Sequence, residues 1–154
     1  MEDAAFERVL FETARPDAVA LSAWPEAARK LFLDQQFEFQ SLHYARAYPN
    51  ADRLLVVADG AAAGRLILDR TPDAWCVVDI ALLPAWRGRG IGTLLLQSVL
   101  AAAAAAGASA VTLMVDIDNP ARRLYQRLGF VTMEEVMPKA AMEWRPASTQ
   151  LKTA

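Results

Sequence analysis

Residues 80–92 read IALLPAWRGRGIG and join a run of strand-forming residues to the start of a predicted helix. The run itself, Trp75 to Leu83, is apolar almost throughout, which is typical of a central strand with both faces covered. Pro84 ends the strand, because proline has no N–H group to offer a sheet. Glycines then alternate with other residues at positions 88, 90 and 92, where they let a backbone approach a ligand closely. This stretch predicts a strand, a tight loop and a helix in direct succession.

The loop also predicts an anion site. The first N–H groups of a helix have no partner within the helix and lie at the positive end of its dipole, so they favour a phosphate. Arg87 and Arg89 add positive charge. Two known phosphate loops do not fit, because no Gly-Lys-Ser/Thr follows and the glycines are spaced GxGxG, after a Pro-Ala-Trp spacer. The remaining pattern, [Q/R]xxGxG/A, is matched by Arg87, Gly90 and Gly92.

The chain after the loop predicts two helices and three strands. The first helix carries six alanines and ends at Gly107, and the second begins at Asn119-Pro120, where Asn is a good cap and Pro suits the first helical position. Gly129 ends that second helix. The strands are expected at Ala110–Val115, Phe130–Val136 and Ala140–Trp144, with a frayed polar tail from Pro146 onward.

The chain before the loop predicts an antiparallel meander behind a long helix. Short β-rich runs at Leu54–Ala58 and Arg65–Asp69 are joined by Asp59-Gly60, and a Thr-Pro-Asp turn leads to the apolar strand. Pro25–Tyr48 has no internal Gly or Pro and predicts a helix, with Phe32, Phe39 and Leu42 on one face. A first strand is expected at Phe6–Thr13, ended by Pro16-Asp17.

The predicted order is therefore β, α, βββ, α, β, α, ββ. This order predicts an α/β (α+β) fold with a mixed, mostly antiparallel sheet and helices on both faces. At 154 residues, 55% of them hydrophobic, the chain matches one domain, 1–154, with a sizeable core.

Composition excludes several classes of function. Sixteen basic and eighteen acidic residues give a net charge of −2, which disfavours general nucleic-acid binding. A single cysteine, Cys76, and a single histidine, His43, leave no disulfide framework and no zinc-ligand cluster, so no metal is predicted. The first ten residues lack a signal-peptide pattern, and the weakly polar run Val99–Val111 is too short to span a bilayer. We expect a cytoplasmic protein that does not enter a membrane.

Two blocks of sequence resemble the GNAT superfamily of acyl-CoA-dependent N-acetyltransferases. Residues 80–92 look like its central strand, proline and pyrophosphate loop, and residues 119–130, NPARRLYQRLGF, are similar to its "N…LYxxLGF" helix. Their separation fits the helix and strand that the family places between them, and the similar organisation extends over roughly 54–144. Gln35-Gln36-Phe37 and His43-Tyr44 also look like a small bacterial-type subgroup of this family. The resemblance implies the GNAT fold.

The resemblance further implies acetyl-CoA as cosubstrate and a role for each matching residue. Main-chain groups of Ile80, Ala81 and Leu82 would bind the pantetheine arm, with the Leu82 N–H polarising the thioester carbonyl as an oxyanion hole does. Asn119 would contact the cofactor arm, and Tyr125 would protonate the departing thiolate. The pyrophosphate would be held by the loop and the helix start, residues Arg87, Gly88, Arg89, Gly90, Ile91, Gly92 and Thr93.

An amine acceptor is mostly ammonium at pH 7 and must lose a proton before it attacks. Asp79 is the first candidate base, because an ionisable residue inside an apolar strand needs a physical reason. His43 is the second, because imidazole exchanges a proton readily near neutral pH. Asp116 is a third, near the strand end where several relatives carry a glutamate, and a base acting through ordered water stays open.

Structural roles compete with these chemical ones. Asp79 is an equally good partner for a backbone N–H or for an arginine such as Arg65, and Tyr125 would also pack as a core aromatic. His43 also fits an ordinary position on a helix face, and the glycine loop also fits a simple tight turn. The arginines of the second block suit a solvated face, from which one could meet the cofactor's 3′-phosphate: Arg122, Arg123 and Arg127.

The sequence thus predicts an enzyme that transfers an acetyl group from acetyl-CoA to a primary amine of a small molecule or peptide. The amine would attack directly through a tetrahedral intermediate, without an acyl-enzyme. One alternative is a non-catalytic acyl-CoA-binding sensor. Another is a macromolecular acetyltransferase acting on a protein N-terminus or an aminoacyl-tRNA, although the net charge speaks against RNA. A homodimer paired through the last strands is a further expectation.

Overall fold

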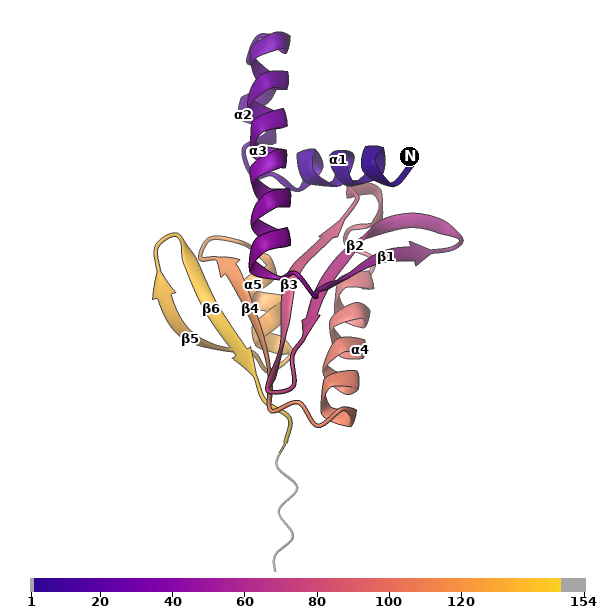
Figure 1. The fold of residues 1–154 in the computed structure, drawn as a ribbon, viewed down its shortest axis with the longest axis vertical. Helices are drawn as coiled ribbons and strands as arrows, with labels where there is room; N and C mark the ends of the chain where they lie inside the picture. The colour runs from indigo at the N-terminus through magenta and orange to yellow at the C-terminus, as the bar shows by residue number, and fades with distance from the viewer. Residues whose placement is uncertain (1, 148–154) are drawn as a thin grey trace, which may run out of the picture. The chain divides into compact units, whose positions relative to one another are not determined.

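A computed structural model describes residues 2–147 of the chain (Figure 1). It contains five α-helices: α1 Glu2–Ala14, α2 Ala18–Ser22, α3 Glu26–Ala47, α4 Ile91–Ala105 and α5 Ala121–Arg127. A 3-10 helix, η1, spans Pro84–Trp86. The strands are β1 Asp52–Ala58, β2 Ala61–Arg70, β3 Ala74–Leu82, β4 Ala110–Asp116, β5 Val131–Val136 and β6 Lys139–Trp144. Within residues 2–147, no helix combines the length and the apolar character needed to cross a membrane.

The strands form a six-stranded sheet in the order β1-β2-β3-β4-β6-β5. β1 and β2 are antiparallel, and so are β4 with β6 and β5 with β6. β3 and β4 are parallel and pair from Ala74 opposite Ala110 to Val77 opposite Leu113. This mixed, mostly antiparallel sheet with helices confirms the predicted α/β class.

The chain divides into two compact units. The first comprises Met1–Asp69 and Val78–Gly92, and the second comprises Arg70–Val77 and Thr93–Ala154. Both β3 and α4 therefore contribute residues to each unit.

The first unit contains a small aromatic core between its three N-terminal helices. Phe11 of α1, Leu21 of α2 and Leu33 of α3 are buried together, and Phe32 and Phe37 pack against them. The Phe11 and Phe37 rings meet edge to face at 5.3 Å, and the Arg8 guanidinium lies 5.5 Å from the Phe37 ring centroid. Figure 1 shows α2 beside α3 and α1 beside the β1–β2 hairpin.

The expected strand at Phe6–Thr13 is wrong, because these residues belong to α1. Leu10 and Phe11 are both buried, at 0% and 5% exposure, which a strand with alternating faces does not achieve against one neighbour. The Arg8–Glu12 ion pair, 2.8 Å between Nε and Oε1, spans one helical turn and supports the helix.

The long helix was predicted correctly, and of the three residues expected on one face, Phe32 packs against the aromatic core. Phe39 and Leu42 are 66% and 44% exposed, while Leu33 is buried and Phe37 packs on the aromatic core. The residues that face α1 and α2 are thus set by those helices, whose position the sequence of α3 alone does not contain.

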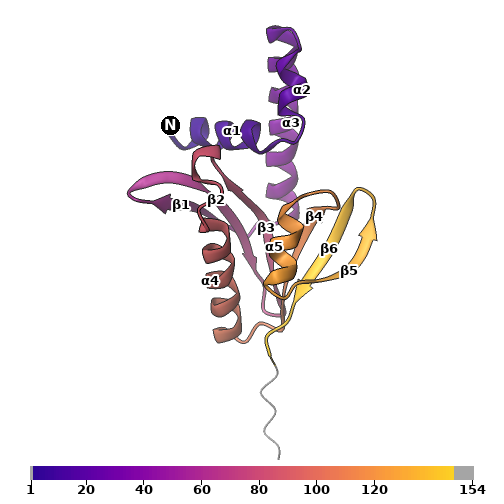
Figure 2. The same ribbon diagram turned by 180° about the vertical axis from the view of Figure 1, so that it is seen from behind.

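The second unit is built from β4, β5 and β6 with α5 on one face of these strands (Figure 2). Its buried residues come from α4, β4, α5 and β6, and they include Leu96, Val111, Tyr125 and Met142. Gly107 ends the helical run at a φ of 78°, and Gly129 follows α5 at 101°, as the sequence predicts. All three strands expected after the loop are present.

Candidate functional site

The end of β3 has one edge turned toward β2. The Ala81 carbonyl oxygen lies 2.2 Å from where a Cβ on Gly64 would be, so only glycine permits this approach. The Leu83 N–H donates to the Ala63 carbonyl of β2 at 2.8 Å. In a trans peptide the N–H and C=O point in opposite directions, so both the N–H and the C=O of Leu82 face away from β2.

This geometry shows which edge of β3 the main-chain groups of residues 80–82 face. Main-chain groups two residues apart on a strand face the same edge, so those of Ile80 lie on the same side as those of Leu82. The Ala81 carbonyl is on the β2 side. Gly64, which permits the close approach, was not singled out from the sequence, although a glycine inside a strand is a recognised signal of close backbone contact.

The glycine loop follows directly. Leu83, Pro84 and Trp86 make a 3-10 turn in which the Trp86 N–H donates to the Leu83 carbonyl at 2.9 Å. Gly88 and Gly90 then adopt φ angles of 72° and 78°, which side chains other than glycine rarely adopt. A Cβ at either glycine would meet nothing within 4 Å, so the glycines are needed for conformation, and the loop is open to solvent. α4 begins immediately afterwards, at Ile91.

The two arginines of the loop have different surroundings. Arg87 donates from Nε to the Leu82 carbonyl and from Nη2 to the Thr13 carbonyl, each at 3.0 Å. Arg89 lies over the Trp86 ring, with its guanidinium carbon 5.0 Å from the centroid. A cation–π contact does not use the N–H groups, so Arg89 keeps them for other partners, whereas Arg87 is bonded to main chain.

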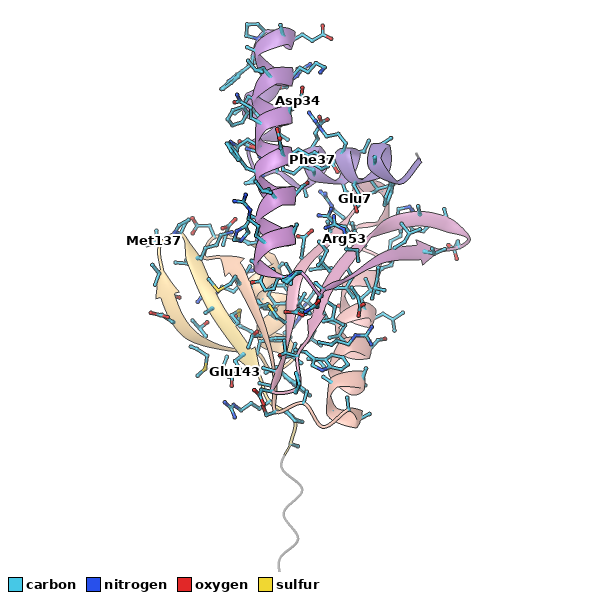
Figure 3. All side chains as sticks on the ribbon, viewed as in Figure 1. Glu7, Asp34, Phe37, Arg53, Met137 and Glu143 are labelled. Atoms are coloured by element: carbon cyan, nitrogen blue, oxygen red, sulfur yellow. The ribbon has the colours of Figure 1, made fainter. Side chains whose placement is uncertain are left out.

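Asp79 belongs to a cluster of charged side chains beneath α1. Its Oδ2 accepts from Arg65 Nη2 at 2.5 Å, and Arg65, on β2, is only 5% exposed. Glu7 of α1 lies 3.6 Å from Arg65 Nη1 and accepts from Arg53 Nη2 at 2.9 Å. Figure 3 shows Glu7 and Arg53 turned toward each other. The structural role considered for Asp79, a pair with Arg65, is therefore present.

Tyr44 of α3 lies near the same charged cluster. Burial, and to a smaller extent the nearby Asp79 charge, raise the pKa of the Tyr44 phenol to about 12. His43 is exposed, and its ring lies 5.9 Å from that of Tyr44. Across residues 2–147, no hydrogen bond or ion pair joins His43 to Asp79. The structure thus brings Asp79 together with Arg65 of β2 and Tyr44 of α3.

In the second unit, Asn119 lies two residues before Ala121, the first residue of α5. Its Oδ1 accepts from the Ala121 N–H at 2.9 Å, which gives the helix the side-chain cap that the sequence predicts. Asn119 also lines an open hollow of about 470 Å³ together with Asp118, Arg123 and Gln126. Arg122 lines it too, but its Nη2 donates to Thr132 Oγ1 at 3.0 Å and also contacts Glu135, so it is not a freely solvated arginine.

Tyr125 and Asp116 also lie in the second unit. Tyr125 is 7% exposed, and its ring packs edge to face on Phe130 at 5.9 Å, so the expected packing role is present. Asp116, at the end of β4, pairs with Lys139 of β6 at 2.7 Å. Within residues 2–147, no cluster of three His, Cys, Asp or Glu side chains could hold a metal ion.

Comparison with known proteins identifies the class to which this fold and loop belong. The family model described as "Acetyltransferase (GNAT) family" matches residues 10–130. The chain belongs to this family, which confirms the resemblance seen in the sequence.

Individual relatives agree with the family. The chain is 32% identical over 105 residues to an L-2,4-diaminobutyric acid acetyltransferase from Nocardia farcinica, a match that covers 66% of this chain and 54% of that protein. The chain thus spans about half the length of this curated relative. The PaiA N-acetyltransferase of Thermoplasma acidophilum, solved in complex with coenzyme A, has a similar fold, with a TM-score of 0.70, 16% identity and 94% of each chain covered. A GNAT family acetyltransferase from Elizabethkingia anophelis with acetyl-CoA bound has a TM-score of 0.59 and 14% identity, over 68% of this chain and 82% of that one.

Proposed function

We propose that this protein transfers the acetyl group of acetyl-CoA to a primary amine of a small molecule or peptide. The observation that carries the proposal is the end of β3, where the Leu82 N–H faces away from β2 just before a glycine loop with positive φ angles. A strand edge from which the Leu82 N–H faces away from β2, followed by a loop of this kind, suits a ligand with an extended amide arm and a diphosphate.

Acetyl-CoA would then be bound mainly by main-chain groups. We assign the diphosphate to the exposed Gly88–Gly90 segment and the start of α4, from Ile91 to Thr93, with Arg89 as the neighbouring cation. The pantetheine arm is assigned to the edge of Ile80 and Leu82, and Asn119 is assigned to the same arm. These assignments follow the residues that match the family's two sequence blocks.

The reaction is a direct acyl transfer. The neutral amine attacks the thioester carbon, and the carbonyl oxygen becomes an oxyanion that the Leu82 N–H stabilises. The C–S bond then breaks and the thiolate takes a proton from the Tyr125 phenol. The nitrogen, cationic after the attack, loses a proton as the amide forms, and this proton restores the phenol through solvent. A phenol, whose pKa is ordinarily near 10, can supply this proton because the sulfur gains charge as the bond breaks.

Asp79 is the proposed acceptor of the amine proton. Its Oδ2 is held by Arg65, so the carboxylate is oriented and we assign Oδ1 to the acceptor. His43 is a weaker candidate, because it is exposed and, among residues 2–147, makes no hydrogen bond or ion pair with Asp79. An ordered water between the amine and Asp79 would serve the same purpose.

The acceptor class to screen first is small amines that carry a second charged group. The curated relative from Nocardia farcinica is a diaminobutyric acid acetyltransferase, which makes diamino acids the natural starting set. Neutral monoamines and peptides with a free N-terminus complete the screen.

Calorimetric titration with acetyl-CoA and with free CoA tests the cofactor, and release of CoA thiol in the presence of each amine tests the transfer. We expect micromolar binding of the cofactor and amine-dependent release. Tyr125→Phe should bind acetyl-CoA like the parent and lower kcat roughly 10²-fold, because it lacks only the phenolic proton. Absence of binding at millimolar acetyl-CoA would refute the proposal, and an unchanged kcat in Tyr125→Phe would refute the role of Tyr125. Saturable binding without turnover of any amine would favour the sensor alternative.

A further inference from the structure

Arg87 opens the [Q/R]xxGxG/A pattern, yet its side chain is bonded to the protein's own main chain. We propose that Arg87 is a positioning residue that holds the end of β3 and the end of α1 in place for acetyl transfer, and that it is not a phosphate ligand. The inference rests on the proposed function for its kinetic part and on the fold for its structural part.

The peptide between Leu82 and Leu83 is held from both sides. Its N–H donates to the Ala63 carbonyl of β2 at 2.8 Å, and its C=O accepts from Arg87 Nε at 3.0 Å. The peptide is therefore bonded on both sides, which fixes its plane. Since the Leu82 C=O and the Leu82 N–H flank the same Cα and face the same edge, fixing the first also orients the second.

Arg87 also contacts the C-terminal end of α1. Thr13 is in the last turn of this helix, where the carbonyl groups have no partner within the helix. Arg87 Nη2 donates to the Thr13 carbonyl at 3.0 Å, and its positive charge suits the negative end of the helix dipole. One guanidinium thus joins the strand end, the start of the glycine loop and α1.

α1 is also connected to the proposed base. Glu7, two turns before Thr13, lies 3.6 Å from Arg65, and Arg65 holds Asp79 at 2.5 Å. Arg87 is therefore tied to the C-terminal end of α1, and Asp79 is tied through Arg65 to its middle. Loss of the Arg87 bonds should disturb the Leu82 N–H directly and the Asp79 carboxylate through α1.

This role predicts a particular division of effects. A ligand of the diphosphate would change the affinity for CoA, whereas a positioning residue changes kcat. Arg87→Ala should lower kcat roughly 10-fold or more, as expected for loss of hydrogen bonds from a charged donor, and should change the dissociation constant of CoA less than about threefold. Arg89→Ala, which removes the neighbouring guanidinium, should weaken CoA more than it lowers kcat. Arg145→Ala, at an exposed arginine that follows β6 and pairs with Glu143 on the surface, is the charge-matched control and should change neither quantity.

Two additions keep the test decisive. Arg87→Lys retains the charge but offers one point donor, so it should recover part of kcat, and it replaces Arg87→Ala should that variant not fold. Hydrogen exchange of the full chain gives a readout without turnover: in Arg87→Ala the amides of residues 10–15 and 82–87 should exchange faster than in the parent and in Arg145→Ala.

Each outcome of these measurements supports or overturns the proposed role of Arg87. A CoA dissociation constant raised tenfold with kcat little changed would make Arg87 a phosphate ligand and overturn the proposal, and so would no change in either quantity. If the parent binds CoA but acetylates no amine, the proposed function fails. Hydrogen exchange then still tests the structural role of Arg87. Faster exchange at both segments would then retain its structural role, and unchanged exchange would overturn it.

Discussion

Two ion pairs join neighbouring strands in this molecule, and they differ mainly in burial. Arg65 of β2 pairs with Asp79 of β3 at 2.5 Å, and Lys139 of β6 pairs with Asp116 of β4 at 2.7 Å. The side chains of the first pair are 7% and 23% exposed, and those of the second are 50% and 43% exposed. Similar distances therefore occur in very different dielectric surroundings.

The difference decides what each pair does. An exposed pair is screened by water and salt and contributes little, because the attraction barely exceeds the entropy lost in holding two long side chains. A buried pair has already lost much of its hydration, so removal of one partner leaves an uncompensated charge. The Arg65–Asp79 pair is thus expected to stabilise the fold and to orient the Asp79 carboxylate. The exposed Asp116–Lys139 pair is expected to contribute little to stability.

The largest effect should come from breaking the buried pair at its most buried member. Arg65→Leu leaves Asp79 without its partner and removes the nearby charge that faces Glu7. We expect the free energy of unfolding to fall by about 3 kcal/mol, the low end for a broken buried pair, because Asp79 keeps part of its exposure. Urea denaturation of the parent and the variant measures this. A loss below about 1 kcal/mol would place the pair in the same class as an exposed one.

The double variant Arg65→Leu with Asp79→Leu sharpens this result. It removes both charges, and Glu7 still has Arg53 at 2.9 Å, so most of the uncompensated charge is gone. We expect it to regain at least half of the stability lost in Arg65→Leu. A double variant less stable than the single one would show that shape, and not charge, controls this site.

The next effect concerns the pKa of Tyr44, which lies near the Arg65–Asp79 pair. Burial and the Asp79 charge raise the pKa of Tyr44 to about 12, so the folded protein holds this proton more tightly than the unfolded chain does. The stability associated with it is fully present below pH 10 and is lost as the pH rises toward 12. Ultraviolet absorbance of phenolate should show a late-titrating tyrosine that Tyr44→Phe removes. Asp79→Asn should lower the pKa of Tyr44 while burial keeps it above 10, and an unshifted titration would contradict their proximity.

The smallest effect is expected at the exposed pair. Lys139→Ala should lower the free energy of unfolding by less than about 1 kcal/mol, and the difference should shrink in high salt. Parallel urea melts at low and high ionic strength measure both quantities. A loss as large as that of Arg65→Leu would remove the contrast between the two pairs.

Much of the site could be predicted because local chemistry determines it. Pro84 cannot continue a sheet, and Gly88 and Gly90 stand where φ is 72° and 78°, so the strand, loop and helix follow from neighbouring residues. The cap at Asn119 and the stop at Gly129 are equally local. The matching blocks at residues 80–92 and 119–130 then gave the family.

The N-terminal helix shows where local reasoning fails. The short run Phe6–Thr13 contains aromatic and branched residues that suit either a strand or a helix, and a run of this length cannot separate them. Phe11 becomes buried because α2 and α3 supply the other side of its core. Propensity alone could not choose the helix, and so the contacts of Glu7 and Thr13 were not foreseen.

The sequence by itself determined the α/β class, the glycine loop and the family, because turns, caps and strand ends depend on residues a few positions apart. The tertiary structure decided which partners the charged and aromatic groups have. Arg65 with Asp79, Arg87 with Thr13 and Tyr44 near Asp79 are separated by 14, 74 and roughly 35 positions. Such pairs form because the fold, and not the chain order, brings the groups together, and burial strengthens the Arg65–Asp79 pair by removing water from it.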